Sequence, residues 1–248
     1  MAKKTMKEAV RRKRSQERTE EISWELIDRV LESENINSVL LWGPPGTGKT
    51  FAGYTNGRTQ RGVWMCTLTQ ETPASELRGN FMPRGDSLVW EDGPVIRAMK
   101  EGARLVLNEI SHASDDVLAF LHPILEDAAT ARMRLPSNEE VAPAPGFNVV
   151  VCDNESPDDL PTALADRFDS ELHVARPHPD ALAQLSLPLR EAALRSFAIE
   201  GDRRVSIRSW LTLDRIRGEF GLEDACLVVF GAERGSQICD ALRMAGGF

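Results

Sequence analysis

The sequence predicts an α/β protein with a five-stranded parallel sheet between helices, followed by a small α-helical region. Short apolar runs alternate with stretches of helical periodicity, a pattern typical of parallel sheets covered on both faces. A glycine-rich loop follows the first apolar run directly. Beyond residue 178 the apolar runs stop and only helical patterns remain. Together these three observations set the fold class.

The expected strands are apolar runs bounded by Gly, Pro or polar residues. The first, Ser38 to Trp42, is apolar after its opening serine, which predicts a strand buried on both faces. The others are 62–68, 104–107, 147–152 and the weaker 171–174.

The expected helices lie between these strands. Ile22, Leu26, Ile27 and Val30 recur at helical spacing and predict an amphipathic helix over 21–33. Further helices are expected at 50–56, 94–101, 115–125 and 161–167. Two longer connections are rich in Gly, Pro and charge and predict hairpins or loops, at 78–92 and 128–146. The chain is thereby divided into a basic arm, an α/β domain and a helical subdomain, over 1–20, 21–177 and 178–248.

The composition is that of a globular protein, with 42% hydrophobic and 27% charged residues in 248. No apolar run approaches the roughly 18 residues that span a bilayer, so we expect no membrane segment and a soluble, cytoplasmic protein. The cysteines are scattered, without Cys-x-x-Cys spacing, at Cys66, Cys152, Cys226 and Cys239. They are expected to be buried free thiols, which fits a reducing compartment.

Charge is distributed unevenly along the chain. Residues 1–20 carry a net +5, whereas the rest of the chain carries −13. A basic arm on an acidic body favours contact with nucleic acid or an acidic partner, and a solvated helical extension is the alternative. The acidic body argues against a broad surface that tracks phosphates.

A phosphate-binding motif follows the first strand. The pattern G-x-x-x-x-G-K-[ST] is matched in full by Gly43, Pro44, Pro45, Gly46, Thr47, Gly48, Lys49 and Thr50. Glycines let backbone N–H groups turn toward phosphate oxygens, and the following helix N-terminus adds partial positive charge. Lys49 would reach the β- and γ-phosphates of ATP, and the Thr50 hydroxyl would ligate Mg²⁺.

The third strand ends in Asn108 and Glu109, where a P-loop ATPase usually carries two acidic residues. The first of these holds Mg²⁺ through water, and the second polarises the attacking water. Asn108 still offers an oxygen to the metal but no charge, so Mg²⁺ affinity and the hydrolysis rate are expected to fall. Glu109 is the expected catalytic carboxylate.

Three further polar residues are candidates for the nucleotide site. Asn154, just beyond the fourth strand, would hydrogen-bond the γ-phosphate or the lytic water, and an Asx turn is the alternative. Arg167 suits a transition state with charge spread over phosphate oxygens, and a surface ion pair with Asp166 or Asp169 is its alternative. Arg208 is a candidate for contacting the nucleotide from the helical subdomain. A role unrelated to the nucleotide is an equally open alternative.

These segments resemble the AAA+ ATPases, and within them the MoxR-like group, which includes helpers of nitric-oxide reductase and Rubisco activation and the small cobaltochelatase subunit. The resemblance runs from about 38 to 175. Its residues are GPPGTGKT, ELRGNF, SLVWEDGPVIRAMKEGARLVLNEI, DDVLAFLHPILED, FNVVVCDN and LADRFD. The W-x-D-G-P segment, Trp90 to Pro94, is the most discriminating piece. Over 178–248 the match is looser and rests on the Arg208 segment.

The resemblance implies roles for the site residues. Lys49 and Thr50 become Walker A, Asn108 and Glu109 Walker B, and Asn154 sensor 1. Arg167 becomes the arginine finger that acts on a neighbour's nucleotide, and Arg208 becomes sensor 2. The family also implies a helical lid, hairpin inserts and homo-oligomeric rings, commonly hexamers.

Three functions remain open from the sequence. The first is an ATP-driven machine that remodels a protein partner, often one with a von Willebrand A domain. The second is a nucleic-acid motor or defence component that uses the basic arm. The third is an ATP-dependent assembly module whose hydrolysis is attenuated by Asn108.

Overall fold

The computed structural model describes residues 22–126, 130–197 and 204–245. The described residues form two compact units. The first contains residues up to Gly43 and Lys49–His173, and the second contains Pro44–Gly48 and the chain from Val174 onward. The basic arm lies outside the described residues, and the division at 177/178 stays a prediction.

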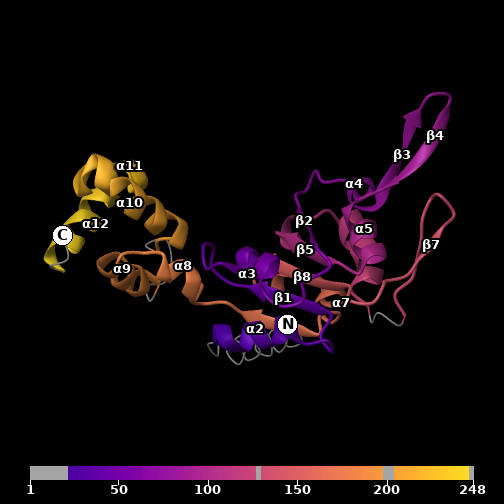
Figure 1. Cartoon of the computed structure of the whole chain (residues 1–248), viewed down its shortest axis with the longest axis horizontal. Helices are drawn as coiled ribbons and strands as arrows, with labels where there is room; N and C mark the ends of the chain where they lie inside the picture. The colour runs from indigo at the N-terminus through magenta and orange to yellow at the C-terminus, as the bar shows by residue number, and fades with distance from the viewer. Residues whose placement is uncertain (1–21, 127–129, 198–203, 246–248) are drawn as a thin grey trace, which may run out of the picture. The chain divides into compact units, whose positions relative to one another are not determined.

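A five-stranded parallel sheet is the centre of the first unit (Figure 1). Its strand order is β2-β5-β8-β1-β9, with bounds Val63–Thr67, Arg104–Asn108, Asn148–Asp153, Ser38–Trp42 and Ser170–His173. The five expected strands are thus confirmed to within one or two residues. The central strands β5, β8 and β1 are buried almost throughout, which explains their continuous apolar runs.

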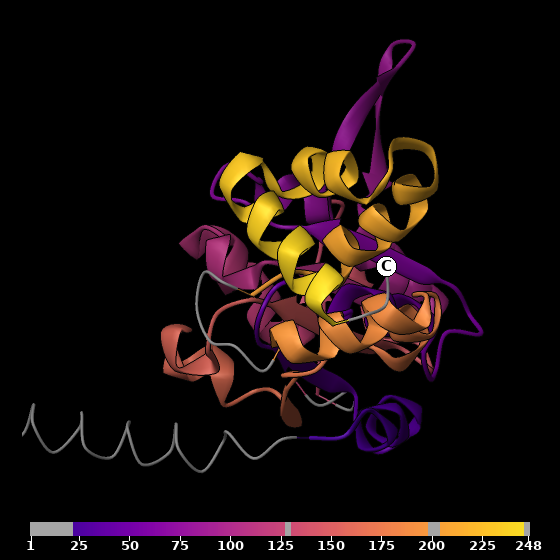
Figure 2. The ribbon, with the colours of Figure 1, turned by 90° about the vertical axis from the view of Figure 1, so that its left-hand side faces the viewer.

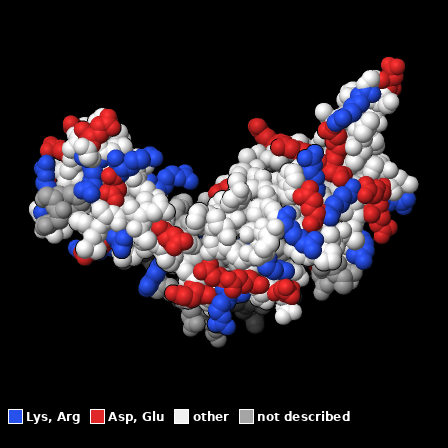
Figure 3. Space-filling model, in the orientation of Figure 1, with Lys and Arg blue, Asp and Glu red and all other residues white. Residues whose placement is uncertain are grey.

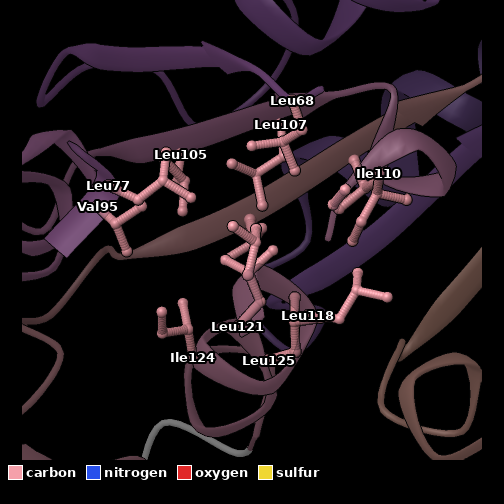
Figure 4. Close-up of a cluster of buried hydrophobic side chains, with 14 of the residues drawn as sticks. Leu68, Leu77, Val95, Leu105, Leu107, Ile110, Leu118, Leu121, Ile124 and Leu125 are labelled. Carbon is pink, nitrogen blue, oxygen red and sulfur yellow. The ribbon is translucent and has the colours of Figure 1, made fainter. Parts of the chain in front are cut away.

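The two faces of the sheet are covered by different helices. Leu105 and Leu107 of β5 join a core cluster with α5 (Pro94–Glu101) and α6 (Asp115–Leu121), seen in Figure 4. The intervening Val106 lies on the opposite face, beneath Gly53 of α3. This alternation is the strand period of two, and it places α3 directly over the central strands. The remaining helices and turns of this unit are α2 (Trp24–Glu32), α3 (Lys49–Thr55), α4 (Ala74–Arg78), η1 (Ile110–His112), η2 (His122–Ile124), η3 (Pro157–Asp159) and α7 (Thr162–Ala165).

A fully buried arginine is hydrogen-bonded to both α2 and α3. Arg104 donates to the carbonyl oxygens of Leu31, Gly53 and Asn56 and to Asn148 Oδ1, and it is 1% exposed. Burial lowers the pKa of its guanidinium to about 10. Carbonyls near the end of α3 thereby gain a cationic partner, which stabilises the helix that starts at Lys49.

Both expected inserts contain hairpins. Strands β3 (Gly79–Arg84) and β4 (Ser87–Asp92) pair antiparallel and extend away from the sheet (Figure 1). The second hairpin pairs β6 (Met133–Arg134) with β7 (Glu140–Val141). Lys100 of α5 joins the two inserts, because its ammonium donates to Asp92 at 2.7 Å and to Glu139 at 2.9 Å.

The W-x-D-G-P segment forms the base of the longer hairpin. Asp92 accepts hydrogen bonds from Trp90 Nε1 and Lys100 Nζ, each at 2.7 Å. A Cβ on Gly93 would lie 2.4 Å from the Leu77 carbonyl oxygen, so only glycine fits. Pro94 then begins α5 at a position where no backbone N–H is needed.

Among the described residues after Val174, the regular elements are all helices, as the sequence predicts. Figures 1 and 2 show its helices in orange to yellow: α8 (Pro179–Ala183), α9 (Leu187–Phe197), α10 (Ile207–Phe220), α11 (Leu222–Phe230) and α12 (Ala232–Met244). Trp210 and Leu213 of α10 belong to its own apolar core. No described helix in either unit is long and apolar enough to cross a bilayer.

Candidate nucleotide-binding and hydrolysis site

The predicted site residues of the first unit follow three adjacent strands. Gly43 follows β1, Asn108 and Glu109 end or follow β5, and Asn154 follows β8. Because β8 pairs with both β1 and β5 in parallel, the carboxyl ends of these strands meet at one edge of the sheet. Residues more than 100 positions apart in the sequence are thereby brought into contact.

Lys49 is the buried cation of this edge. Its Nζ donates to the Gly43 carbonyl at 2.7 Å and to Asn154 Oδ1 at 3.0 Å. Burial lowers the pKa of the ammonium to about 8, although the negative charges of Glu109 and Asp153 are among those that oppose the shift. A buried ammonium held by neutral oxygens is well placed to exchange them for phosphate oxygens.

Thr50 and Asn108 form the second contact. The Thr50 hydroxyl donates to Asn108 Oδ1 at 2.9 Å. Both atoms are oxygen donors of the kind that Mg²⁺ prefers, so this pair suits the ion, bound directly or through water. Among the described residues no group of three or more His, Cys, Asp or Glu side chains could hold a metal.

Glu109 and Asn154 are joined directly. Asn154 Nδ2 donates to Glu109 Oε1 at 2.8 Å, while its Oδ1 accepts from Lys49. The amide thus connects the expected catalytic carboxylate to the lysine that is expected to bind phosphate. The Asx-type bond at this strand end is made by Asp153, whose Oδ1 accepts from the Glu155 N–H at 2.9 Å.

Glu109 has an unusual backbone. Its φ of 60° and ψ of 48° are left-handed, a conformation that costs a non-glycine residue free energy. The His112 side chain lies near the same carboxylate, with Nδ1 3.8 Å from Glu109 Oε2. Neither the backbone angle nor the histidine contact could be read from the sequence.

The middle of the glycine-rich loop clusters with the C-terminal helices in the second unit. The His178 N–H donates to the Thr47 carbonyl at 2.7 Å, and the Ile207 N–H donates to the Gly46 carbonyl at 3.4 Å. Gly48 has φ +101°, and a Cβ there would lie 2.8 Å from His178 Cβ, so this position requires glycine. Arg208 is exposed on α10, one residue beyond Ile207.

Arg167 lies away from the phosphate loop. It forms an ion pair with Glu126, not with Asp166 or Asp169, and its side chain is 30% exposed. Its carbonyl accepts from Ser38 Oγ at the amino end of β1, whereas the phosphate loop begins at the carboxyl end. A five-residue strand of about 15 Å therefore separates Arg167 from the lysine edge of the same chain.

A parallel sheet in this order, with a glycine-rich loop and buried lysine at its carboxyl edge, defines the P-loop nucleoside triphosphatases. The chain belongs to the family "AAA domain (dynein-related subfamily)", whose model matches residues 38–168. Within the AAA+ ATPases it is of the MoxR type, as its relatives are.

The chain is similar in sequence to two known proteins and in fold to one solved structure. Protein NorQ of Paracoccus denitrificans is 38% identical over 120 residues, 47% of this chain and 43% of NorQ. Protein CbbQ of Hydrogenophilus thermoluteolus is 26% identical over 192 residues, 68% of this chain and 70% of CbbQ. The crystal structure of NtrX from Brucella abortus shares the fold with a TM-score of 0.52 and 14% identity, over 97% of this chain and 54% of NtrX. The match to NorQ thus spans less than half of that relative.

Proposed function

We propose that this chain binds ATP with Mg²⁺, hydrolyses it in a homo-oligomeric ring and uses the energy to remodel a protein partner. The observation that carries the proposal is the continuous contact from Lys49 through Asn154 to Glu109. In this proposal Lys49 is the phosphate-binding cation and Glu109 the water-polarising carboxylate, and both contact the amide of Asn154. Membership of the AAA+ ATPases supports the same chemistry.

Each residue has a distinct task in this proposal. Lys49 binds the β- and γ-phosphates, and Thr50 with Asn108 holds the metal. Glu109 accepts a proton from the attacking water, and Asn154 holds that water or the γ-phosphate in line. Bound Mg²⁺ would neutralise charge on the β- and γ-phosphates. Arg208 is proposed to contact the nucleotide phosphates.

The role of Glu109 can be tested by Glu109→Gln. The amide cannot take a proton from water, so phosphate release should fall by about 10²–10⁴-fold. Binding of a non-hydrolysable ATP analogue, measured by calorimetry, should change little because Lys49 and Thr50 are untouched. Turnover equal to that of the wild type would overturn the assignment of Glu109.

Ring assembly and action on a partner are supported by two features of the first unit. Arg167 lies too far from its own phosphate loop to act there, so a neighbouring chain is the natural recipient. The longer hairpin exposes apolar side chains that a protein partner could cover, at Phe81, Met82, Leu88 and Val89. We propose a hexamer and a partner of the von Willebrand A type, following the family. All four cysteines are free thiols, which fits a cytoplasmic location.

Attenuated hydrolysis is a second candidate, favoured by the neutral Thr50–Asn108 pair. Asn108→Asp would add a charge at this pair and strengthen metal binding, because charge-assisted contacts are about twice as strong as neutral ones. We expect half-maximal turnover at roughly 5- to 10-fold lower Mg²⁺, together with faster turnover at saturation. An unchanged Mg²⁺ dependence in phosphate-release assays would mean that another residue supplies the metal shell.

The nucleic-acid function has the weakest support. Its basis is the basic arm, which lies outside the described residues. On the face shown in Figure 3, basic and acidic side chains are interspersed over the described residues rather than gathered into a basic stripe. Binding of nucleic acid that weakens steeply with salt would favour this alternative.

A further inference from the structure

Asp153 lies at the point where three segments of the site meet. It is the last residue of β8 and is 2% exposed. Its Oδ2 accepts from the Ser111 N–H at 2.7 Å, and its Oδ1 accepts from Ser111 Oγ and the Glu155 N–H, both at 2.9 Å. Its backbone carbonyl accepts from the N–H of Gly43, the first residue of the phosphate loop, at 3.2 Å. Asp153 thus contacts the phosphate loop, the turn after Glu109 and the residue after Asn154.

The Asp153 carboxylate contacts residues that lie close in sequence to Glu109 and Asn154, the two residues assigned to the attacking water in the proposed function. Ser111 lies two positions after Glu109, in the turn Ile110–His112 that follows the left-handed residue. Glu155 directly follows Asn154. A left-handed backbone at Glu109 persists only where its surroundings impose it. The contacts from Asp153 to Ser111 provide such a constraint, and the contact to Glu155 fixes the turn that carries Asn154.

We infer that Asp153 is a positioning residue for ATP hydrolysis, which orients Glu109 through Ser111 and Asn154 through Glu155. The inference rests on the proposed function, because it acts through the roles assigned to Glu109 and Asn154. The Asp153 side chain is not proposed to touch the nucleotide, but its negative charge also raises the pKa of Lys49. Binding is therefore compared at a pH at least one unit below about 8, where Lys49 stays protonated in the wild type. The contact with Gly43 uses the backbone carbonyl, so nucleotide binding should survive a change of the side chain.

Asp153→Asn is the informative substitution because it keeps the size of the side chain. The carboxylate accepts from two backbone N–H groups and one hydroxyl, whereas an amide has one acceptor oxygen and an NH₂ donor. In either orientation the NH₂ group faces a backbone N–H, of Ser111 or of Glu155. We expect the turn carrying Glu109 or that carrying Asn154 to shift. A shift of about 1 Å at a catalytic group can cost 10²-fold in rate.

The second unit offers a matched control. Asp214 accepts from the Ser186 N–H at 2.6 Å and from Ser186 Oγ at 3.0 Å, the same pair of contacts that Asp153 makes with Ser111. Asp214→Asn therefore removes a carboxylate with the same serine contacts, and with an added ion pair to Arg217, outside the proposed catalytic residues. Thermal unfolding of both variants measures their structural cost on a common scale.

The experiment compares kcat, KM and binding of a non-hydrolysable ATP analogue in the full chain. Asp153→Asn should lower kcat roughly 10- to 100-fold with less than about threefold change in analogue affinity, whereas Asp214→Asn should keep kcat. In the Glu109→Gln background, Asp153→Asn should lower kcat by a smaller factor than in the wild type, because one of the two groups that it positions is already lost. Ser111→Ala should lower kcat, and Ser111→Thr, which retains the hydroxyl, should restore it.

The outcomes separate the inference from the proposed function. If Glu109→Gln keeps full turnover, the proposed function itself fails. If Glu109→Gln loses turnover but Asp153→Asn behaves like Asp214→Asn, only the inference is overturned. If Asp153→Asn lowers kcat by the same factor in the Glu109→Gln background as in the wild type, its role is a general structural one and the inference is also overturned. Should Asp153→Asn not fold, equal turnover of Ser111→Ala and Ser111→Thr would overturn the inference.

Discussion

Replacing Lys49 by alanine is expected to lower the affinity for Mg·ATP by at least about 100-fold. The ammonium is buried, and its contacts include the Gly43 carbonyl and Asn154 Oδ1. A hydrogen bond to a charged group contributes about 1.5–3 kcal/mol, and Lys49 would lose contacts with two phosphates. The combined loss corresponds to roughly 10²–10⁴-fold in Kd.

Calorimetric titration with a non-hydrolysable ATP analogue measures this loss. Lys100→Ala is the matched control, because it removes another lysine with two hydrogen-bonded partners, Asp92 and Glu139, outside the proposed site. The control should keep wild-type affinity. An unchanged Kd in Lys49→Ala would refute the assignment of residues 43–50 as the phosphate loop.

The second large effect is expected at Arg167. Arg167→Ala should bind ATP almost normally and lose hydrolysis by about 10³–10⁵-fold, the range known for arginines supplied in trans. The structure gives a reason for action in trans, since Arg167 is at the amino edge of the sheet and Lys49 at the carboxyl edge. Its ion pair with Glu126 holds the guanidinium within its own chain in the absence of a neighbour.

Mixing two inactive proteins tests the trans arrangement. Arg167→Ala retains Glu109, and Glu109→Gln retains Arg167. A mixed ring therefore contains interfaces at which an intact Glu109 meets an intact neighbouring Arg167, and phosphate release should partly recover. Mixed rings without recovery, or a protein that stays monomeric with ATP bound, would rule out this role for Arg167.

Local patterns predicted most of the sheet and its phosphate loop. The run Ser38–Trp42 and the loop after it contain their own signals: an apolar strand, glycines and a lysine in fixed order. The expected helix 115–125 was wrong in one respect. The observed α-helix ends at Leu121, and a 3₁₀ turn over His122–Ile124 follows it. The α-helix stops there because Pro123 lacks a backbone N–H and restricts the residue before it.

Contacts between distant residues were not predictable in this way. Asp153 and Ser111 are 42 positions apart, and Arg104 and Leu31 are 73 apart, yet each pair is joined by hydrogen bonds. The sequence identified Asn154 and Glu109 as separate candidates, whereas the strand order brings them together. The helix α4 was also missed, since five residues are too few for a helical period to stand out.

Single-turnover conversion of bound ATP by the wild-type chain tests most directly whether the Lys49–Asn154–Glu109 contact is a hydrolysis centre. Protein in excess over ATP would be mixed with Mg²⁺, and ADP formation followed with time alongside a sample containing chelator. We predict that ADP and phosphate form only when Mg²⁺ is present, and that the rate rises with protein concentration as chains associate. ATP that stays intact on an associated, Mg²⁺-loaded protein would contradict hydrolysis at this site and favour the assembly module.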